Sequence, residues 1–292
     1  MKFLEKHPMS MILIGILGIS LSSIFVKYSQ APSAVTAAWR LLWTVLLTTP
    51  ATLLRRETRR EITGMGMKML LLSGLSGLCL AIHFATWFES LGHTSVASST
   101  TIVCTEVIWV CLGYWLFLGG GISRKALLAI GITLAGSVLI AWSDSGRGGL
   151  YGDLLALAAA VAVAVYTLLG RVVREKVSTV AYTWVVYVTC ALSLLGFCAI
   201  RQQPLTGWGV SAPLVGLLLA VFSTVLGHSI FSWCLKYFSP AFVSASKLCE
   251  PVAAAILAAF LFGELPTLLQ IFGAVLIIGG VLYYAKVERN NS

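Results

Sequence analysis

The chain has 292 residues, of which 58% are hydrophobic and 11% are charged. A typical soluble domain is about 45–50% apolar and about 25% charged, so this composition excludes a soluble globular protein. The net charge of +9 would favour nucleic-acid binding only if the basic residues clustered on one folded face. They are instead spread over short connections between hydrophobic segments. We therefore expect a lipid bilayer as the surroundings and no nucleic-acid partner.

Ten hydrophobic segments follow one another along the chain, each about as long as a helix needs to cross the hydrocarbon of a bilayer. They are continuously apolar rather than alternating, which excludes the strands of a membrane barrel. No small-residue cleavage site follows the first segment, so we expect it to stay on the protein. The expected fold is an all-α membrane protein with ten transmembrane helices, at residues 9–28, 35–54, 69–89, 95–118, 125–143, 152–172, 180–200, 212–234, 241–262 and 267–285.

The distribution of basic residues predicts the orientation, because cytoplasmic loops carry an excess of Lys and Arg. With the N-terminus inside, three basic residues fall on the outer side: Lys27, Arg147 and Arg201. Fifteen fall on the inner side, namely Lys2, Lys6, Arg55, Arg56, Arg59, Arg60, Lys68, Arg124, Lys125, Arg171, Arg174, Lys176, Lys236, Lys286 and Arg289. We therefore expect a multi-pass protein of the cell membrane with both termini in the cytoplasm.

An internal repeat appears when the chain is compared with itself at a shift of about 144 residues. The run 104–107 followed by 116–120 then lies over the run 248–251 followed by 260–264. The chain therefore divides into two halves, 1–145 and 146–292, each with five predicted spans. Because five is odd, the second half must cross the membrane in the opposite sense. Such inverted repeats are typical of secondary transporters, whose substrate sites lie near the midplane between the repeats.

Two carboxylates fall near the centres of predicted spans, where a charge costs at least about 2.5–3.5 kcal/mol to insert. Glu106 and Glu250 occupy equivalent positions in the two halves, so we expect both to face one central cavity. A carboxylate removed from water favours its protonated form, which suits proton coupling or binding of an ammonium group. The alternative is structural pairing. Lys247, three residues before Glu250 on the same helical face, is the expected partner of Glu250; Glu106 has no cation among its chain neighbours.

Other polar and aromatic residues inside the spans are further candidates for the lining of the cavity. Arg40 could contact substrate, hold a carboxylate or reach outward to the interface. His83 and His228 could relay protons, although an interhelical hydrogen bond is the more common role. The remaining candidates are three tryptophans, which could wall a pocket for an apolar group or simply pack between helices: Trp87, Trp109 and Trp233.

One proline lies deep inside a predicted span. Pro251 removes a backbone hydrogen bond directly beside Glu250 and is expected to kink the ninth span there. We therefore predict that it is a structural hinge in a helix that lines the cavity.

Several runs resemble the EamA-type drug/metabolite transporters. In the second half these are 152–157, Gly227-His228, 233–237, and Glu250-Pro251-Val252 leading to 261–264; in the first half they are 38–42, 90–91 and 95–99. The resemblance covers the whole chain. It implies ten helices in two inverted five-helix repeats around a central cavity, alternating access, and export or exchange of small metabolites, often amino acids. Glu106-Val107 replaces the usual proline-containing step, so we expect the fourth span to lack the kink of the ninth.

The sequence thus predicts a secondary transporter for small amphipathic metabolites, amino acids or amines above all, with protons as a candidate coupling ion. Glu106, Glu250 and Lys247 would form the polar centre. A passive pore or a non-transporting membrane sensor is the alternative. A membrane-embedded enzyme is least favoured, because the usual hydrolase, protease and phosphate-binding motifs are missing. We expect no catalytic residue, cofactor or metal, and the oligomeric state has no signal in the sequence.

Overall fold

The computed structural model describes residues 8–94, 96–143, 149–262 and 267–291. Within these ranges the secondary structure is helical and no strand occurs. The first half contains α2 (Pro8–Ser20), α3 (Ser22–Val26), α4 (Ser33–Leu54), α5 (Arg56–Thr63), α6 (Met67–Ser90), α7 (Val96–Cys104), α8 (Glu106–Leu118) and α9 (Arg124–Ser143). The second half contains α10 (Leu150–Arg174), α11 (Thr179–Ile200), α12 (Ser211–Leu218), the π-helix η1 (Leu219–His228), α13 (Ser229–Cys234), α14 (Pro240–Lys247), α15 (Glu250–Phe262) and α16 (Leu268–Asn291).

Eight helical segments of the described chain are long and apolar enough to cross a membrane. They are Pro8–Val26, Ser33–Leu54, Met67–Ser90, Ser98–Leu118, Leu150–Arg174, Thr179–Ile200, Ser211–Cys234 and Leu268–Glu288. Each overlaps one of the ten predicted spans. Helix α9 and the interrupted pair α14 and α15 overlap the other two but are not among the eight. The protein is therefore an all-helical, multi-pass membrane protein, and the exact count of ten is not established by these helices.

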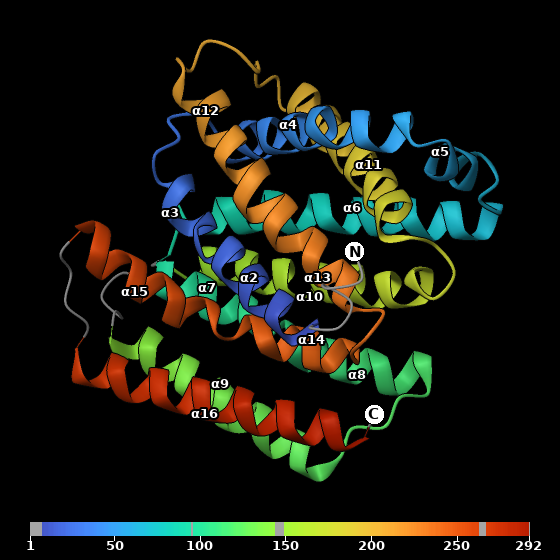
Figure 1. Cartoon of the computed structure of the whole chain (residues 1–292). Helices are drawn as coiled ribbons and strands as arrows, with labels where there is room; N and C mark the ends of the chain where they lie inside the picture. Colours follow the sequence, from blue (N-terminus) through green and yellow to red (C-terminus); the bar gives the residue numbers. More distant parts are fainter. Residues whose placement is uncertain (1–7, 95, 144–148, 263–266, 292) are drawn as a thin grey trace.

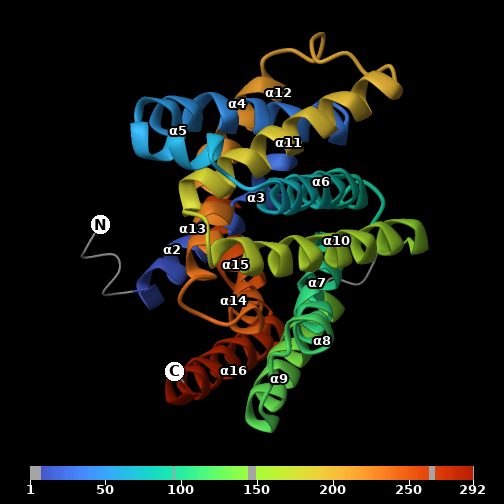
Figure 2. The same cartoon turned by 90° about the vertical axis from the view of Figure 1, so that its right-hand side faces the viewer.

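The helices pack with equivalent segments of the two halves in contact. Helices α9 and α16 lie side by side along one edge of the molecule, and α4 and α11 pack together at the opposite edge (Figure 1). In the sequence, a shift of 144 residues aligns α9 with α16, and a shift of 145 aligns α4 with α11, so each pair consists of equivalent helices of the two repeats. Between these edges α6 packs against α10 (Figure 2), and α2 packs against η1. The interior therefore lies between α6, α10, α2 and η1.

Glycine allows α9 and α16 to approach closely. A Cβ atom on Gly136 would lie 2.6 Å from the carbonyl oxygen of Gly273, and a Cβ on Gly273 would lie 2.7 Å from the carbonyl oxygen of Gly136. Both distances are too short for a side chain. The contact thus depends on two glycines facing each other, which is how small residues let membrane helices pack.

Helices of both halves are interrupted in the interior. Leu21 separates α2 from α3, Thr105 separates α7 from α8, and Leu248 and Cys249 separate α14 from α15. The fourth span, which was expected to lack the kink of the ninth, is thus interrupted at Thr105, one residue before Glu106. The hydroxyl of Thr105 donates to the carbonyl oxygen of Ile102 at 2.6 Å, and a hydroxyl that captures a nearby carbonyl competes with regular helix bonding. The first half is thus interrupted without a proline.

The eighth predicted span contains an irregularity that has no recognised sequence pattern. Residues 219–228 form the π-helix η1. The hydroxyl of Thr224 donates to the carbonyl oxygen of Leu219 at 3.2 Å, and the hydroxyl of Ser229 donates to that of Thr224 at 3.2 Å. π-helical turns are rare and occur frequently at functional sites.

Candidate functional site

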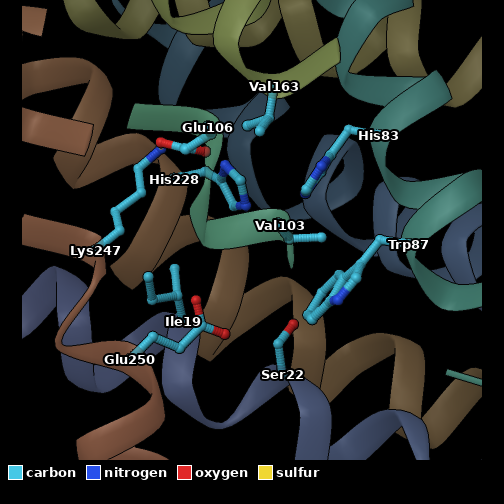
Figure 3. A pocket seen from close by; sticks show the side chains of 10 residues that line it. All are labelled: Ile19, Ser22, His83, Trp87, Val103, Glu106, Val163, His228, Lys247 and Glu250. Carbon is cyan, nitrogen blue, oxygen red and sulfur yellow. The ribbon is translucent and has the colours of Figure 1, made fainter. Parts of the chain in front are cut away.

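A cavity lies in the interior, at the points where the helices are interrupted. Its volume is about 40 Å³, and its lining residues come from both halves (Figure 3): Ile19, Ser22, His83, Trp87, Val103, Glu106, Val163, His228, Lys247 and Glu250. Six of these were predicted from the sequence: His83, Trp87, Glu106, His228, Lys247 and Glu250. Irregular backbone at membrane depth is tolerated only where protein or a water-filled cavity surrounds it, which agrees with this location.

The lining is largely made of equivalent residues from the two halves. The 144-residue shift relates Ile19 to Val163, Val103 to Lys247, and Glu106 to Glu250, and a shift of 145 relates His83 to His228. The cavity therefore lies where the same segments of the two repeats meet. Ile19, Val103 and Val163 were not predicted, although the repeat, applied to Lys247, would have found Val103.

The cavity holds a buried ion pair between the two halves. The ammonium nitrogen of Lys247 lies 2.8 Å from Oε1 of Glu106, and the two residues are only 8% and 3% exposed. Lys247 ends α14 and Glu106 begins α8. A cation at a helix C-terminus and an anion at a helix N-terminus are both stabilised by the helix dipole.

This pairing corrects the expectation that Lys247 neutralises Glu250. The two residues are three apart, but Leu248 and Cys249 interrupt the helix between them, so the spacing rule for one continuous helix face does not apply. Glu250 forms no ion pair within 4.0 Å with a described residue. Because Val103 occupies the position equivalent to Lys247, the cavity has one lysine for two carboxylates, and Glu250 has no partner of opposite charge among the described residues.

Glu250 and Pro251 open α15 after the interruption. Pro251 is the second residue of that helix, a position where a missing N–H costs little because no helical carbonyl is available to it. The helix is therefore broken before Glu250 rather than kinked within a continuous span. The hinge role of Pro251 stays a prediction. The carboxylates of Glu106 and Glu250 thus share one local setting, the first residue of a helix that begins at the cavity.

The two histidines and Trp87 form an aromatic wall. Nδ1 of His83 donates to the carbonyl oxygen of Ala159 at 3.0 Å, which joins α6 to α10. The His83 ring is stacked on Trp87 with centroids 5.8 Å apart and lies 6.2 Å from the ring of His228. The interhelical hydrogen bond expected of an intramembrane histidine is therefore present at His83, in a residue that also lines the cavity.

Arg40 lies directly behind the cavity wall. Its side chain is completely buried. Nε donates to the hydroxyl of Thr224 in η1 at 2.7 Å, and Nη1 donates to the hydroxyl of Ser22 at 3.3 Å. The guanidinium carbon lies 4.0 Å from the ring centroid of Phe84. Arg40 neither reaches the interface nor pairs with a described carboxylate, and it touches the cavity through Ser22, a residue that sequence reasoning missed.

Two predicted tryptophans are not among the described residues that line the cavity. Trp109 is 37% exposed, because it lies on the outer face of α8 beside Ile108 and Leu112 rather than on the buried face that carries Glu106. Trp233 packs against Tyr237 with ring centroids 4.5 Å apart. Both were predicted only from residue type and span, which say nothing about the direction of a side chain.

The described residues contain no group of three or more His, Cys, Asp or Glu side chains that could hold a metal ion. The cavity thus presents charged, aromatic and hydroxyl groups, which can bind a small polar molecule by hydrogen bonds and charge.

Comparison with known proteins assigns the class. Residues 8–142 and again residues 150–285 match the EamA-like transporter family. The uncharacterized transporter sll1319 of Synechocystis sp. is 25% identical over 287 residues, which cover 94% of this chain and 86% of that protein. An uncharacterized transporter of Clostridium kluyveri is 24% identical over 239 residues, covering 79% of this chain and 76% of the relative. A solved crystal structure shares the fold, with a TM-score of 0.74 and 20% identity over 97% of this chain and 99% of that one.

The helical membrane fold and the paired family matches point to a membrane transporter rather than an enzyme. The chain belongs to the EamA-like transporter family, and the family domain occurs in it twice.

Proposed function

We propose that this protein is a secondary transporter that exports or exchanges small amphipathic metabolites, amino acids or amines, by alternating access coupled to protons. It would have ten spans in two inverted five-helix repeats, 1–145 and 146–292, around the central cavity. Both termini would lie on the cytoplasmic side of the cell membrane. Glu106, Lys247 and Glu250 would form the polar centre of the substrate site, with His83, His228 and Trp87 as its walls.

The observation that carries the proposal is the pairing of equivalent residues from both halves around buried charges. Substrate sites of inverted-repeat transporters lie between the repeats and are built from interrupted helices. Charged side chains inside a membrane are rare and are by default candidates for a substrate or ion pathway. The cavity combines these features at one place.

The small size of the cavity supports alternating access. A volume of about 40 Å³ accommodates a few water molecules, whereas small-molecule sites typically measure about 300–1,000 Å³. A substrate could enter only if the helices that close the cavity separate. Interruptions at Leu21, Thr105 and Leu248 supply places where half-helices can move relative to each other.

Proton coupling is supported by the excess of carboxylate. Lys247 balances Glu106, so a proton or a cationic substrate group on Glu250 would neutralise the remaining negative charge. A carboxylate that has no counter-ion in a low-dielectric site gains most from either. If the proton and the cationic group of the substrate bind Glu250 in turn, proton movement and substrate movement would be coupled.

Uptake by purified protein in liposomes tests the proposal. Labelled amino acids and amines should show saturable flux and counterflow. Linear, non-saturating flux would indicate a passive pore, and binding without flux would indicate a sensor. If no compound of the panel shows saturable flux or counterflow, the proposal is overturned.

A further inference from the structure

Two buried hydrogen-bond donors beside the cavity have no acceptor among the described residues. They are Nη2 of Arg40 and the indole Nε1 of Trp87, on residues that are 0% and 5% exposed. A buried donor without a partner loses its interaction with water and gains nothing in return, and such groups are rare in native proteins. Each therefore calls for an oxygen atom that the protein itself does not supply.

The positive charge of Arg40 is also unbalanced. Its two hydrogen bonds go to the hydroxyls of Thr224 and Ser22, and Phe84 and Phe88 offer only their ring faces, at 4.0 and 5.9 Å. No described carboxylate pairs with it within 4.0 Å. A buried charge costs several kcal/mol unless an opposite charge compensates it, which favours an anionic group as the missing partner.

Trp87 lines the cavity, and Arg40 lies behind its wall and reaches it through Ser22. Ser22, which accepts from Arg40, and Trp87 line the cavity; Figure 3 shows the Ser22 hydroxyl and the Trp87 indole on the same side of it. The stacking of Trp87 on His83 holds the indole in that position. The residue that the 144-residue shift pairs with Ser22 is Tyr166, whose hydroxyl is bonded to that of Ser232 at 2.8 Å. The donors therefore make one side of the cavity different from the other.

Glu250, which carries the opposite charge, is connected through its backbone to the segment that contains Ser22. The hydroxyl of Ser20, two residues before Ser22, donates to the backbone carbonyl oxygen of Glu250 at 3.4 Å. The interruption at Leu21 thus connects the helix that begins with Glu250 to the residue that accepts from Arg40. With Glu106 and Lys247 paired, the carboxylate of Glu250 and the guanidinium of Arg40 are the charges at the cavity without an ion-pair partner among the described residues.

We propose that the substrate is a zwitterion whose carboxylate binds at Nη2 of Arg40 and Nε1 of Trp87, beside Ser22, and whose ammonium group binds at Glu250. The inference rests on the proposed transport function and narrows its substrate to compounds that carry both charges, such as α-amino acids. A simple amine would leave Arg40 without a counter-charge, and a simple carboxylic acid would do the same to Glu250. Widening of the cavity at the Leu21 interruption would uncover the guanidinium.

Matched compounds test this in wild-type protein. We would measure counterflow of phenylalanine, leucine and glutamine, each with its decarboxylated amine and its deaminated acid, in liposomes. At least one amino acid should be transported with a kcat/KM at least about tenfold above both of its analogues, since a site built for a charged group rejects compounds that lack it. Amines transported as well as their parent amino acids would overturn the inference and leave the transport proposal standing. If none of the nine compounds shows saturable flux, both the inference and the transport proposal are overturned.

Replacement of single donors locates the subsite. Trp87→Phe keeps an aromatic ring but removes Nε1–H, so the preference for the amino acid over its amine should fall at least about tenfold, the lower end of the range expected for a lost hydrogen bond to a charged group. Arg40→Gln should abolish the preference. Trp43→Phe is the matched control, because Nε1 of Trp43 donates to the carbonyl oxygen of Pro213 at 2.9 Å, outside the cavity lining. An unchanged preference in Trp87→Phe, or an equal loss in Trp43→Phe, would contradict the assignment.

Discussion

Lys247 and Glu106 lie 141 residues apart in the chain and join the two halves of the molecule, with the ammonium nitrogen 2.8 Å from a carboxylate oxygen. The bond connects the end of α14 to the start of α8. Removal of one member of a buried pair leaves the other as an uncompensated charge, whereas replacement of both can be nearly neutral. The pair is therefore sensitive to single substitutions.

Glu106→Gln is expected to destabilise the protein by about 3–5 kcal/mol, and Lys247→Met combined with Glu106→Gln should recover a large part of the loss. Thermal unfolding in detergent measures both. Glu89→Gln is the control, because Glu89 and its partner His93 are exposed and surface pairs contribute only about 0–1 kcal/mol. Equal melting temperatures for Glu106→Gln and wild type would show that the pair does not stabilise the fold.

Glu250→Gln should abolish the response of flux to a pH gradient. In wild-type liposomes a gradient of one pH unit should drive substrate against its own gradient, up to about tenfold for one proton per substrate, because one pH unit corresponds to about 1.4 kcal/mol. The substrate should move toward the acidic side if it exchanges with protons. A variant that cannot release a proton at position 250 should retain at most exchange of substrate for substrate. A full pH response in Glu250→Gln would assign coupling to another group.

Gly136→Ala should destabilise the contact between α9 and α16 by about 1–3 kcal/mol, the usual cost of overpacking, since the new Cβ would lie 2.6 Å from the carbonyl oxygen of Gly273. Gly131→Ala, in the same helix, meets no heavy atom within 4 Å. It should be neutral or stabilising by up to about 1 kcal/mol through helix propensity. Thermal unfolding of the two variants measures the difference. Equal melting temperatures would contradict the close contact at Gly136.

Thr224→Val should cost about 1–3 kcal/mol, because the buried guanidinium of Arg40 loses the acceptor that lies 2.7 Å from its Nε. Thr86→Val is the matched control, since its hydroxyl bonds only to carbonyl oxygens of its own helix. Thermal unfolding measures the difference. Equal stability of the two variants would show that Thr224 does not anchor Arg40.

The helical class and much of the cavity could be predicted because lipid imposes strong constraints on sequence. A charge at membrane depth is costly enough to stand out, which is why Glu106, Glu250 and Lys247 were recognised as one polar centre. The repeat then related Glu106 to Glu250, and the structure places both in the cavity lining.

The errors concern features that depend on tertiary packing rather than on local sequence. The partner of Lys247 was predicted from spacing along one helix face, but the helix ends at Lys247 and a new one starts at Glu250. The direction of Trp109 depends on how α8 is rotated in the bundle, and a hydrophobic segment with a small moment gives no indication of rotation. The π-helix from Leu219 to His228 depends on which carbonyls the hydroxyls of Thr224 and Ser229 reach, which tertiary packing decides.

The central claim, that the cavity around Glu250 is the substrate site of a transporter, is tested most directly by the initial rate of saturable flux. We would compare wild type, Glu250→Gln and Glu89→Gln, each reconstituted as equal amounts of folded protein. The account predicts that Glu89→Gln transports like wild type and that Glu250→Gln loses at least about 90% of net flux, as expected when a charge contact in a binding site is removed. Wild-type flux in Glu250→Gln would contradict it.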